Sequence, residues 1–158
     1  MVRSAVPHDL TAIAGMIRAL AEYEKLTHEC VFTDAELEKE LFGPSPGAEV
    51  LVAEKAGRVV GFALFFQSFS TFLARRGIYL EDLFVLPEAR GEGHAKALLQ
   101  RLAALAVERG CGRLEWSVLD WNAQAIGFYR SIGAVPMDDW TVQRLTGDSL
   151  RALASATV

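Results

Sequence analysis

The sequence predicts an α/β fold that combines a hairpin-built, antiparallel half with a half built from crossover connections. Two apolar runs, 50–54 and 59–66, are separated by four residues that include a glycine, which is typical of a β-hairpin. Further along the chain, apolar strands alternate with helical patterns, which is typical of crossovers. Because 158 residues can bury a sizeable core, we expect a single domain over residues 1–158.

The first half is expected to form a strand, two helices and the hairpin. Residues 2–6 are a short strand, and a helix follows with Asp9 as its N-cap. A second helix begins at Thr33, because Glu36 three residues later completes a capping box. Residues 43–47 hold two glycines and two prolines, and they therefore form a loop before the hairpin.

The second half alternates strands and helices. We expect a polar loop at 68–77, then a strand at 78–86 and a helix that ends near Gly110. The remaining expected elements are a strand at 114–118, a helix at 122–132, a strand at 140–145 and a short helix at 149–154.

The strand at 78–86 changes its apolar phase. Ile78 and Leu80 lie on one face, and continuing by twos would place Asp82 there. The apolar residues instead resume at Leu83 and Val85. Either this strand is buried on both faces, or a β-bulge near Asp82 resets the alternation and turns backbone groups toward a ligand.

The segment after this strand has the pattern of an anion-binding loop. Arg90-Gly91-Glu92-Gly93 joins the strand to a helix, and the unpaired N–H groups of a first helical turn attract phosphate. Lys96 stands where a dinucleotide fingerprint needs its third glycine, and no Walker loop exists. The pattern [RQ]-x-x-G-x-[GA] does fit, at Arg90, Gly93 and Ala95. The alternative is a helix entered through an ordinary glycine turn.

Composition excludes several classes. The charged fraction of 23% is that of a globular protein, and the net charge of −4 argues against nucleic acid as the main partner. Two cysteines and three scattered histidines give no metal-ligand spacing, so we expect no metal. No apolar run approaches a membrane span and no signal peptide is seen, so we expect a cytoplasmic protein that does not contact membranes.

Several motifs together resemble the GNAT superfamily of acetyl-CoA-dependent N-acetyltransferases over nearly the whole chain. They are the glycine loop, Trp121-Asn122 at a helix start, and Phe128-Tyr129 closed by Ile132-Gly133-Ala134. Leu20 to Leu26, Tyr79 to Asp82 and Val118 to Asn122 are similar to the spermidine/spermine and thialysine acetyltransferase branch.

The resemblance implies a mostly antiparallel, seven-stranded sheet that splays into a V between its fourth and fifth strands. Acetyl-CoA would occupy the wedge, and we also expect a homodimer. The implied cofactor-binding residues are the strand positions Leu83, Phe84 and Val85, the loop Arg90, Gly91, Glu92, Gly93, His94, Ala95 and Lys96, and the helix start Asn122, Ala123, Gln124 and Ala125, with Tyr129 beside the thioester sulfur.

Acetyl transfer to an amine requires a base, an oxyanion donor and an acid for the departing thiolate. Glu81 is the expected base and Tyr129 the expected acid. Without the family, Glu81 and Asp82 could be a solvated pair and Tyr129 could pack within its helix. The implied residues that hold the amine are Tyr23, Glu24, Glu81, Asp82, Asp138 and Trp140.

The expected substrate is a small cationic amine: a thialysine-like amino acid, a diamine or a polyamine. Phe72 stands where the branch carries a tryptophan, and Ser70 and Thr71 precede it where polyamine enzymes tend to carry an acid. These departures favour thialysine-like or shorter amines over polyamines. The alternatives are acetylation of protein lysines or N-termini, which needs an open peptide groove, and a non-catalytic acyl-CoA-binding module, which would have lost the acid.

Overall fold

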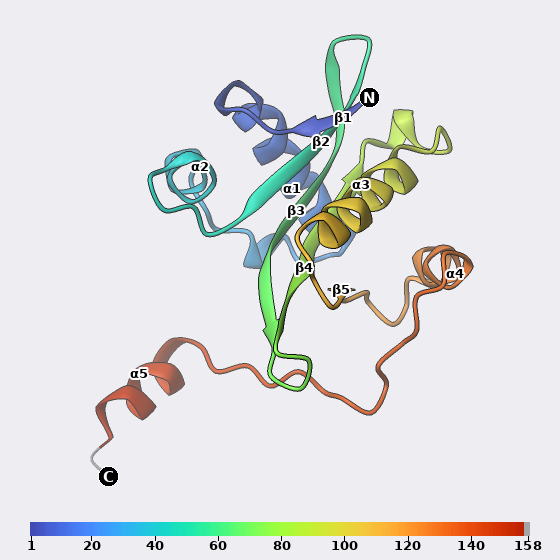
Figure 1. Ribbon diagram of the computed structural model, residues 1–158. Helices are drawn as coiled ribbons and strands as arrows, with labels where there is room; N and C mark the ends of the chain where they lie inside the picture. Colours follow the sequence, from blue (N-terminus) through green and yellow to red (C-terminus); the bar gives the residue numbers. More distant parts are fainter. Residues whose placement is uncertain (157–158) are drawn as a thin grey trace. The chain divides into compact units, whose positions relative to one another are not determined.

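The chain forms two units, Met1–Ser117 and Val118–Val158, in a computed structural model that describes residues 1–156. The sheet and three helices belong to the first unit (Figure 1). Its elements are β1 (Val2–Ser4), α1 (Leu10–Tyr23), α2 (Asp34–Phe42), β2 (Glu49–Lys55), β3 (Arg58–Ser70), β4 (Arg75–Val85), α3 (His94–Glu108) and β5 (Leu114–Trp116). The second unit contains α4 (Ala123–Ser131) and α5 (Gly147–Ser155).

One mixed sheet of five strands runs in the order β1-β2-β3-β4-β5. The first four strands pair antiparallel, and β5 pairs parallel with β4. Ala56 and Gly57 connect β2 to β3 with φ angles of 49° and 76°, the left-handed pair that a two-residue hairpin requires. The mixed α/β fold and the hairpin are confirmed, whereas seven strands were expected and the described residues form five.

Two expected elements were wrong. The predicted loop at 68–77 belongs mostly to a long β3–β4 hairpin, because β3 continues to Ser70 and β4 restarts at Arg75. The polar residues of this segment suggested a loop, although they belong to a two-stranded hairpin that is exposed near its tip. The expected strand at 140–145 does not form in the described chain. A strand needs a neighbour for its backbone hydrogen bonds, and none of the described strands pairs with this segment.

The helices cover both faces of the sheet, with α1 and α3 on opposite sides (Figure 1). Ile13 and Met16 of α1 pack in one cluster with Phe62 and Phe84 of the central strands. Helix α3 buries Leu98, Leu99, Leu102 and Ala106. This packing fixes β4 between two helical layers, so its residues have defined surroundings on each face.

The predicted caps had different outcomes. Thr33 and Glu36 form the expected capping box, with Thr33 Oγ1 accepting from the Glu36 N–H at 3.3 Å. Asp9 stands at the N-cap position of α1, but its carboxylate makes no cap bond there. It accepts instead from the Val6 N–H at 2.8 Å and from the Arg3 guanidinium.

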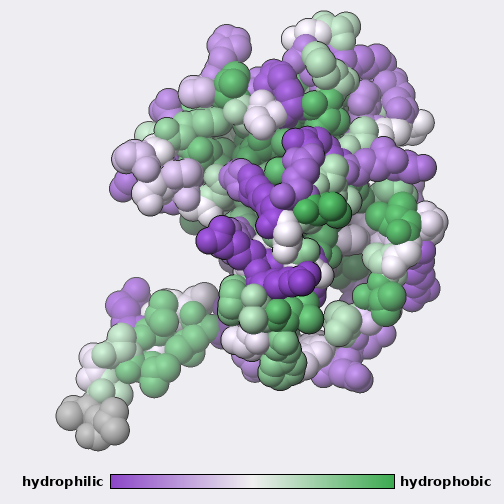
Figure 2. Space-filling model, viewed as in Figure 1, coloured by the Kyte–Doolittle hydropathy of each residue, from purple (hydrophilic) through white to green (hydrophobic). Residues whose placement is uncertain are grey.

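The second unit contains two short helices joined by an irregular segment. Apolar side chains on α5, including Leu150 and Leu153, are exposed and appear as a green surface in Figure 2. Helix α5 begins at Gly147 and ends at Ser155, close to the predicted range.

Candidate active site

A β-bulge interrupts β4 beside the central pair of strands. Leu64 of β3 lies opposite Asp82, whereas the next residue, Phe65, lies opposite Leu80, so Glu81 is the extra residue. The bulge predicted near Asp82 is therefore confirmed, and burial on both faces is not needed to explain the phase change. By the regular alternation of the strand beyond the bulge, Asp82 shares a face with Phe84, which packs against α1.

Three carboxylates meet where this face approaches the end of α1. Burial, followed by the charges of Glu81 and Glu24, raises the pKa of Asp82 from 3.8 to about 6. Burial also raises the pKa of Glu24, which lies just beyond α1. Glu81 is exposed. A group of carboxylates that is short of compensating positive charge favours the binding of a cation.

Beyond the bulge, one edge of β4 is open. The parallel pairing with β5 covers only Ile78 to Leu80, which lie opposite Leu114 to Trp116. Leu83, Phe84 and Val85 pair with β3 on their other side. Within residues 1–156, no strand covers the edge of these three residues toward β5. An extended ligand could therefore hydrogen-bond there, as an extra strand does.

The glycine loop continues from this edge to the start of α3. Gly91 and Gly93 have φ angles of 79° and 85°, so both use the left-handed region that glycine tolerates. Gly93 is the N-cap of α3, and no side chain caps this helix. Its first backbone N–H groups thus remain available for an anion, in keeping with the predicted role of His94, Ala95 and Lys96.

Glu92 is a carboxylate within this loop, but its charge is compensated. Lys55 donates to Glu92 Oε1 at 2.6 Å, and His94 Nε2 lies 3.2 Å from Oε2. These hydrogen bonds, that of Lys55 foremost, lower the pKa of Glu92. The role of Lys55 was missed in the sequence, where 37 residues separate the two partners.

The side chain of Arg90 is engaged on the other side of the loop. Its Nε donates to the Val85 carbonyl at 3.0 Å. The guanidinium carbon lies 5.3 Å from the ring centre of Tyr23 and 5.4 Å from that of Phe84. Arg90 therefore connects the predicted cofactor loop to the predicted amine side, which no local sequence signal indicates.

The second unit carries the remaining predicted residues. Asn122 caps α4 by accepting from the Ala125 N–H at 3.2 Å, and Ala123 and Gln124 form the first turn. The rings of Phe128 and Tyr129 lie 5.6 Å apart within α4. Asp138 and Trp140 are exposed in the irregular segment. The helix at Asn122 and the aromatic pair are thus arranged locally as the motif suggests.

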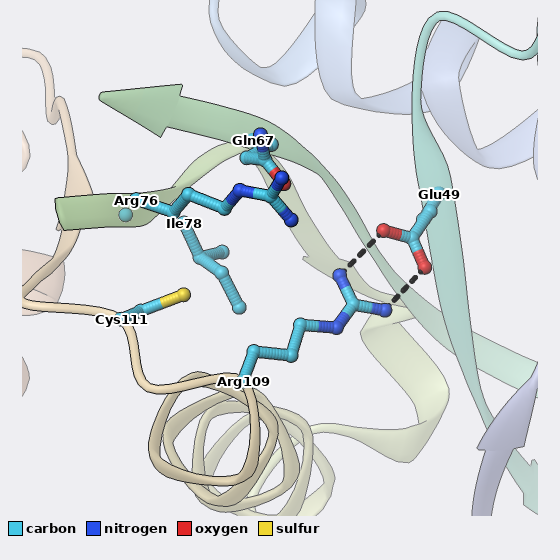
Figure 3. Close-up of a pocket in the computed structure, with 7 residues that line it drawn as sticks. Glu49, Gln67, Arg76, Ile78, Arg109 and Cys111 are labelled. Atoms are coloured by element: carbon cyan, nitrogen blue, oxygen red, sulfur yellow. Dashed lines mark hydrogen bonds and ion pairs between the residues drawn. The ribbon is translucent and has the colours of Figure 1, made fainter.

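A separate cavity of about 420 Å³ lies in the first unit (Figure 3). Arg109 and Glu49 form a two-fold ion pair with both N–O distances at 2.7 Å, which raises the pKa of Arg109. This pair ties the end of α3 to the start of β2, so we interpret it as a structural brace. The lining residues, none of which was a predicted site residue, are Glu49, Gln67, Arg76, Gly77, Ile78, Arg109 and Cys111.

The described residues contain neither a metal-binding cluster nor a membrane-spanning helix. From Met1 to residue 156, no three His, Cys, Asp or Glu side chains are grouped so that they could hold a metal ion. In the same range, no helix is long and apolar enough to cross a membrane.

Comparisons with known proteins agree on one family. Residues 12–134 match the family described as "Acetyltransferase (GNAT) family". The chain is 37% identical to a thialysine N-epsilon-acetyltransferase of Bos taurus, over 98% of this chain and 96% of that protein. It is 34% identical to an L-ornithine N5-acetyltransferase of Arabidopsis thaliana, over 96% of this chain and 86% of the other. Among solved structures, an integron cassette protein of V. cholerae superposes with a TM-score of 0.83 at 28% identity, covering 99% and 98% of the two chains.

Proposed function

The chain belongs to the GNAT family and is an acetyl-CoA-dependent N-acetyltransferase, and from this premise we propose that its acceptor is the primary amine of a small cationic molecule. The candidates are a thialysine-like amino acid, ornithine, a diamine or a polyamine. The observation that carries the proposal is the group of Glu24, Glu81 and Asp82, which lacks a compensating cation strong enough to hold the pKa of Asp82 down. Relatives named for thialysine and ornithine acetylation support the same class.

Acetyl-CoA fits the described geometry as a co-substrate. The uncapped N-terminus of α3 and the left-handed Gly93 suit its pyrophosphate, and the open edge at Leu83 to Val85 suits its extended arm. The proposal keeps the helix start Asn122 to Ala125 as a further contact, on the family resemblance alone.

The proposed reaction is direct attack in a ternary complex. The amine arrives protonated, with a pKa near 10.4 for a lysine-like group, and must lose a proton before its nitrogen attacks the thioester carbon. The carbonyl π electrons move onto oxygen, where a backbone N–H at the bulge would stabilise the charge. The carbonyl then re-forms as the C–S bond breaks, and Tyr129 gives its proton to the departing thiolate. The nitrogen releases its second proton, which returns the Tyr129 phenolate to a phenol through solvent.

The proton acceptor belongs to the pair Glu81 and Asp82. The sequence singled out Glu81, which is exposed and can act directly or through water. Asp82 has the raised pKa, and a base with a pKa near 6 accepts a proton more readily at neutral pH than an ordinary aspartate. Glu24, Tyr23, Asp138 and Trp140 remain proposed contacts to the amine.

A panel of acceptors tests the function. Thialysine, lysine, ornithine, putrescine, spermidine and a lysine-containing peptide are offered with acetyl-CoA, and thiol release is measured. We expect a free diamino compound to have the highest kcat/KM. A peptide that outcompetes every free amine would favour protein acetylation instead, and acetyl-CoA binding without any transfer would favour a non-catalytic module.

The cofactor assignment is tested by Gly93→Val, with Gly110→Val as its matched control. Both glycines have left-handed φ angles and open space around them, but they lie at opposite ends of α3. Gly93→Val should weaken acetyl-CoA binding at least tenfold in calorimetry, whereas Gly110→Val should carry only the shared backbone strain. Equal affinities in the two folded variants would remove the loop from the cofactor site.

The acid is tested by Tyr129→Phe. The ring is retained, so acetyl-CoA affinity should stay near that of the wild type, while kcat falls by about 10²- to 10⁴-fold. Unchanged turnover on the best amine would exclude Tyr129 from the chemistry.

A homodimer and a cytoplasmic location remain proposals. Light scattering tests the first, and localisation of a tagged chain tests the second.

A further inference from the structure

We propose that the side chain of Arg90 is a positioning residue for the amine site and does not ligate the pyrophosphate. It holds the end of α1 against β4 and thereby sets where Glu24 lies relative to Asp82. This inference rests on the proposed function, because it assigns a residue of the glycine loop to the acceptor side of the same reaction.

Three contacts define where the guanidinium lies. Nε donates to the Val85 carbonyl at 3.0 Å, which fixes the group against β4. The guanidinium carbon then lies 5.4 Å from the ring centre of Phe84 and 5.3 Å from that of Tyr23. Both distances are within the range of favourable cation–π contacts. A planar cation that meets two rings and a carbonyl is held more firmly than a flexible ammonium would be.

The end of α1 needs such support. The Leu26 N–H donates to the Ala21 carbonyl at 2.8 Å and the Lys25 N–H donates to the Glu22 carbonyl at 3.0 Å, which is the bonding pattern of a Schellman motif. This motif places Lys25 at a φ of 61°, where glycine is the usual residue. A left-handed lysine is unfavourable by itself and persists where its surroundings fix the backbone.

The same turn carries the amine-side carboxylate. Glu24 lies between Tyr23 and the left-handed Lys25, and its charge contributes to the raised pKa of Asp82. The contact between Arg90 and Tyr23 therefore fixes the residue next to Glu24. Loosening this contact changes the spacing of the carboxylates that would hold the substrate cation.

The loop has other groups for the pyrophosphate. The first N–H groups of α3 are uncapped, and Lys96 is an exposed cation in the first turn of the helix. Arg90 and Lys96 thus divide their roles, with Lys96 for the phosphates and Arg90 for the amine side. Matched variants can separate these roles.

The experiment compares Arg90→Lys with Lys96→Gln. Arg90→Lys keeps the charge and loses the planar fork, so it should raise KM for the best amine by roughly three- to tenfold. Its Kd for acetyl-CoA in calorimetry should stay within about twofold of the wild type. Lys96→Gln should show the reverse, with weaker acetyl-CoA binding and an amine KM near that of the wild type.

S-Acetylpantetheine, which lacks the pyrophosphate, provides the second arm. The increase in amine KM caused by Arg90→Lys should persist with this donor, whereas the effect of Lys96→Gln should disappear. In a double-mutant cycle, Arg90→Lys should have little further effect on amine KM in a Tyr23→Leu background, because its partner is already absent. A residue that merely stabilised the fold would act equally in both backgrounds.

The outcomes separate the inference from the function beneath it. If Arg90→Lys raises the Kd for acetyl-CoA and has no effect with S-acetylpantetheine, Arg90 is a pyrophosphate ligand and the inference is wrong. An unchanged amine KM in an active variant also overturns it. If the wild type transfers acetyl to no small amine, the proposed function fails first.

Discussion

Asp9, at the start of α1, and Asp82, within β4, lie in opposite electrostatic surroundings. Asp9 is 4% exposed and accepts from Arg3 at 2.7 and 3.0 Å and from the Val6 N–H. The hydrogen bonds from Arg3 hold the pKa of Asp9 below its usual range. Asp82 has only Glu81 and Glu24 as charged neighbours that shift its titration, and burial raises its pKa to about 6.

The difference indicates the role of each carboxylate. Around Asp9, the charges of Arg3, Asp9 and Glu54 compensate one another, so the group stabilises the fold where β1 meets the start of α1. Around Asp82, the carboxylates of Glu81 and Glu24 destabilise the free protein, and a cationic substrate would remove that cost. An uncompensated charge of this kind is typical of a functional site.

The largest expected effect follows from removing the charge of Asp9. Asp9→Asn leaves Arg3 with Glu54 as its carboxylate partner and weakens the bonds of a buried group, so it should lower the free energy of unfolding by about 3 kcal/mol at pH 7. Chemical denaturation measures this change. Asp148→Asn, at a carboxylate with a 99% exposed side chain that pairs with Arg151, is the control and should be nearly silent.

The pH dependence of this effect has a defined sign. Because the folded pKa of Asp9 is lowered, its contribution is fully present above the unfolded value of 3.8 and is lost as the pH falls through the folded pKa. The two proteins should therefore converge in stability at strongly acidic pH. A constant gap down to acid unfolding would mean that Asp9 acts through packing rather than charge.

Asp82→Asn should change stability in the opposite direction. The folded pKa is raised, so between 3.8 and about 6 the folded protein binds more protons than the unfolded chain, and stability falls as the pH rises through this window. Removing the charge should raise the free energy of unfolding by about 2 kcal/mol at pH 7, after allowance for solvent screening. The gain should disappear near pH 3.8. Loss of stability at pH 7 would contradict the assignment of Asp82 as an uncompensated charge.

The kinetics of Asp82→Asn sharpen the comparison further. If Asp82 accepts the proton, the ratio of kcat/KM between wild type and variant should be constant above pH 6 and fall about tenfold per pH unit below it. Taking the ratio cancels the titration of the amine itself. Glu81→Gln is the matched variant, and the base is Glu81 if this substitution, rather than Asp82→Asn, removes the pH-dependent limb.

Local chemistry made part of this arrangement predictable. The interrupted alternation between Leu80 and Leu83 suggested a bulge near Asp82, which the strand register places at Glu81. Gly93 before an apolar helix indicated the loop. Thr33 and Glu36 indicated a capping box. All three features could be predicted because each signal acts over only a few residues. The roles of Glu81, Tyr129 and the glycine loop in the reaction stay predictions.

Long-range contacts were not predictable from one sequence. The carboxylate of Asp9 bonds Arg3 and Val6 rather than capping α1, and Arg3 also reaches Glu54, 51 residues away. The strand expected at 140–145 failed for the same reason, since a strand depends on a partner elsewhere in the chain. The contact between Arg90 and Tyr23 crosses from one motif to another, and neither motif encodes it.

The smallest predicted effect is that of Arg3→Lys, which separates the charge of the Arg3–Asp9 pair from its hydrogen-bond geometry. Arg3 bonds both oxygens of Asp9 and uses Nε for Glu54 at 3.0 Å, an arrangement that a single ammonium cannot reproduce. Lysine keeps the charge and can donate a single hydrogen bond to Asp9, so the pKa of Asp9 should stay below its usual range but rise toward it, while about 1 kcal/mol of stability is lost. NMR titration of the Asp9 carboxyl and chemical denaturation measure the two quantities. A full return of the Asp9 pKa to its ordinary value would show that the two-fold hydrogen bond, rather than the nearby charge, lowers it.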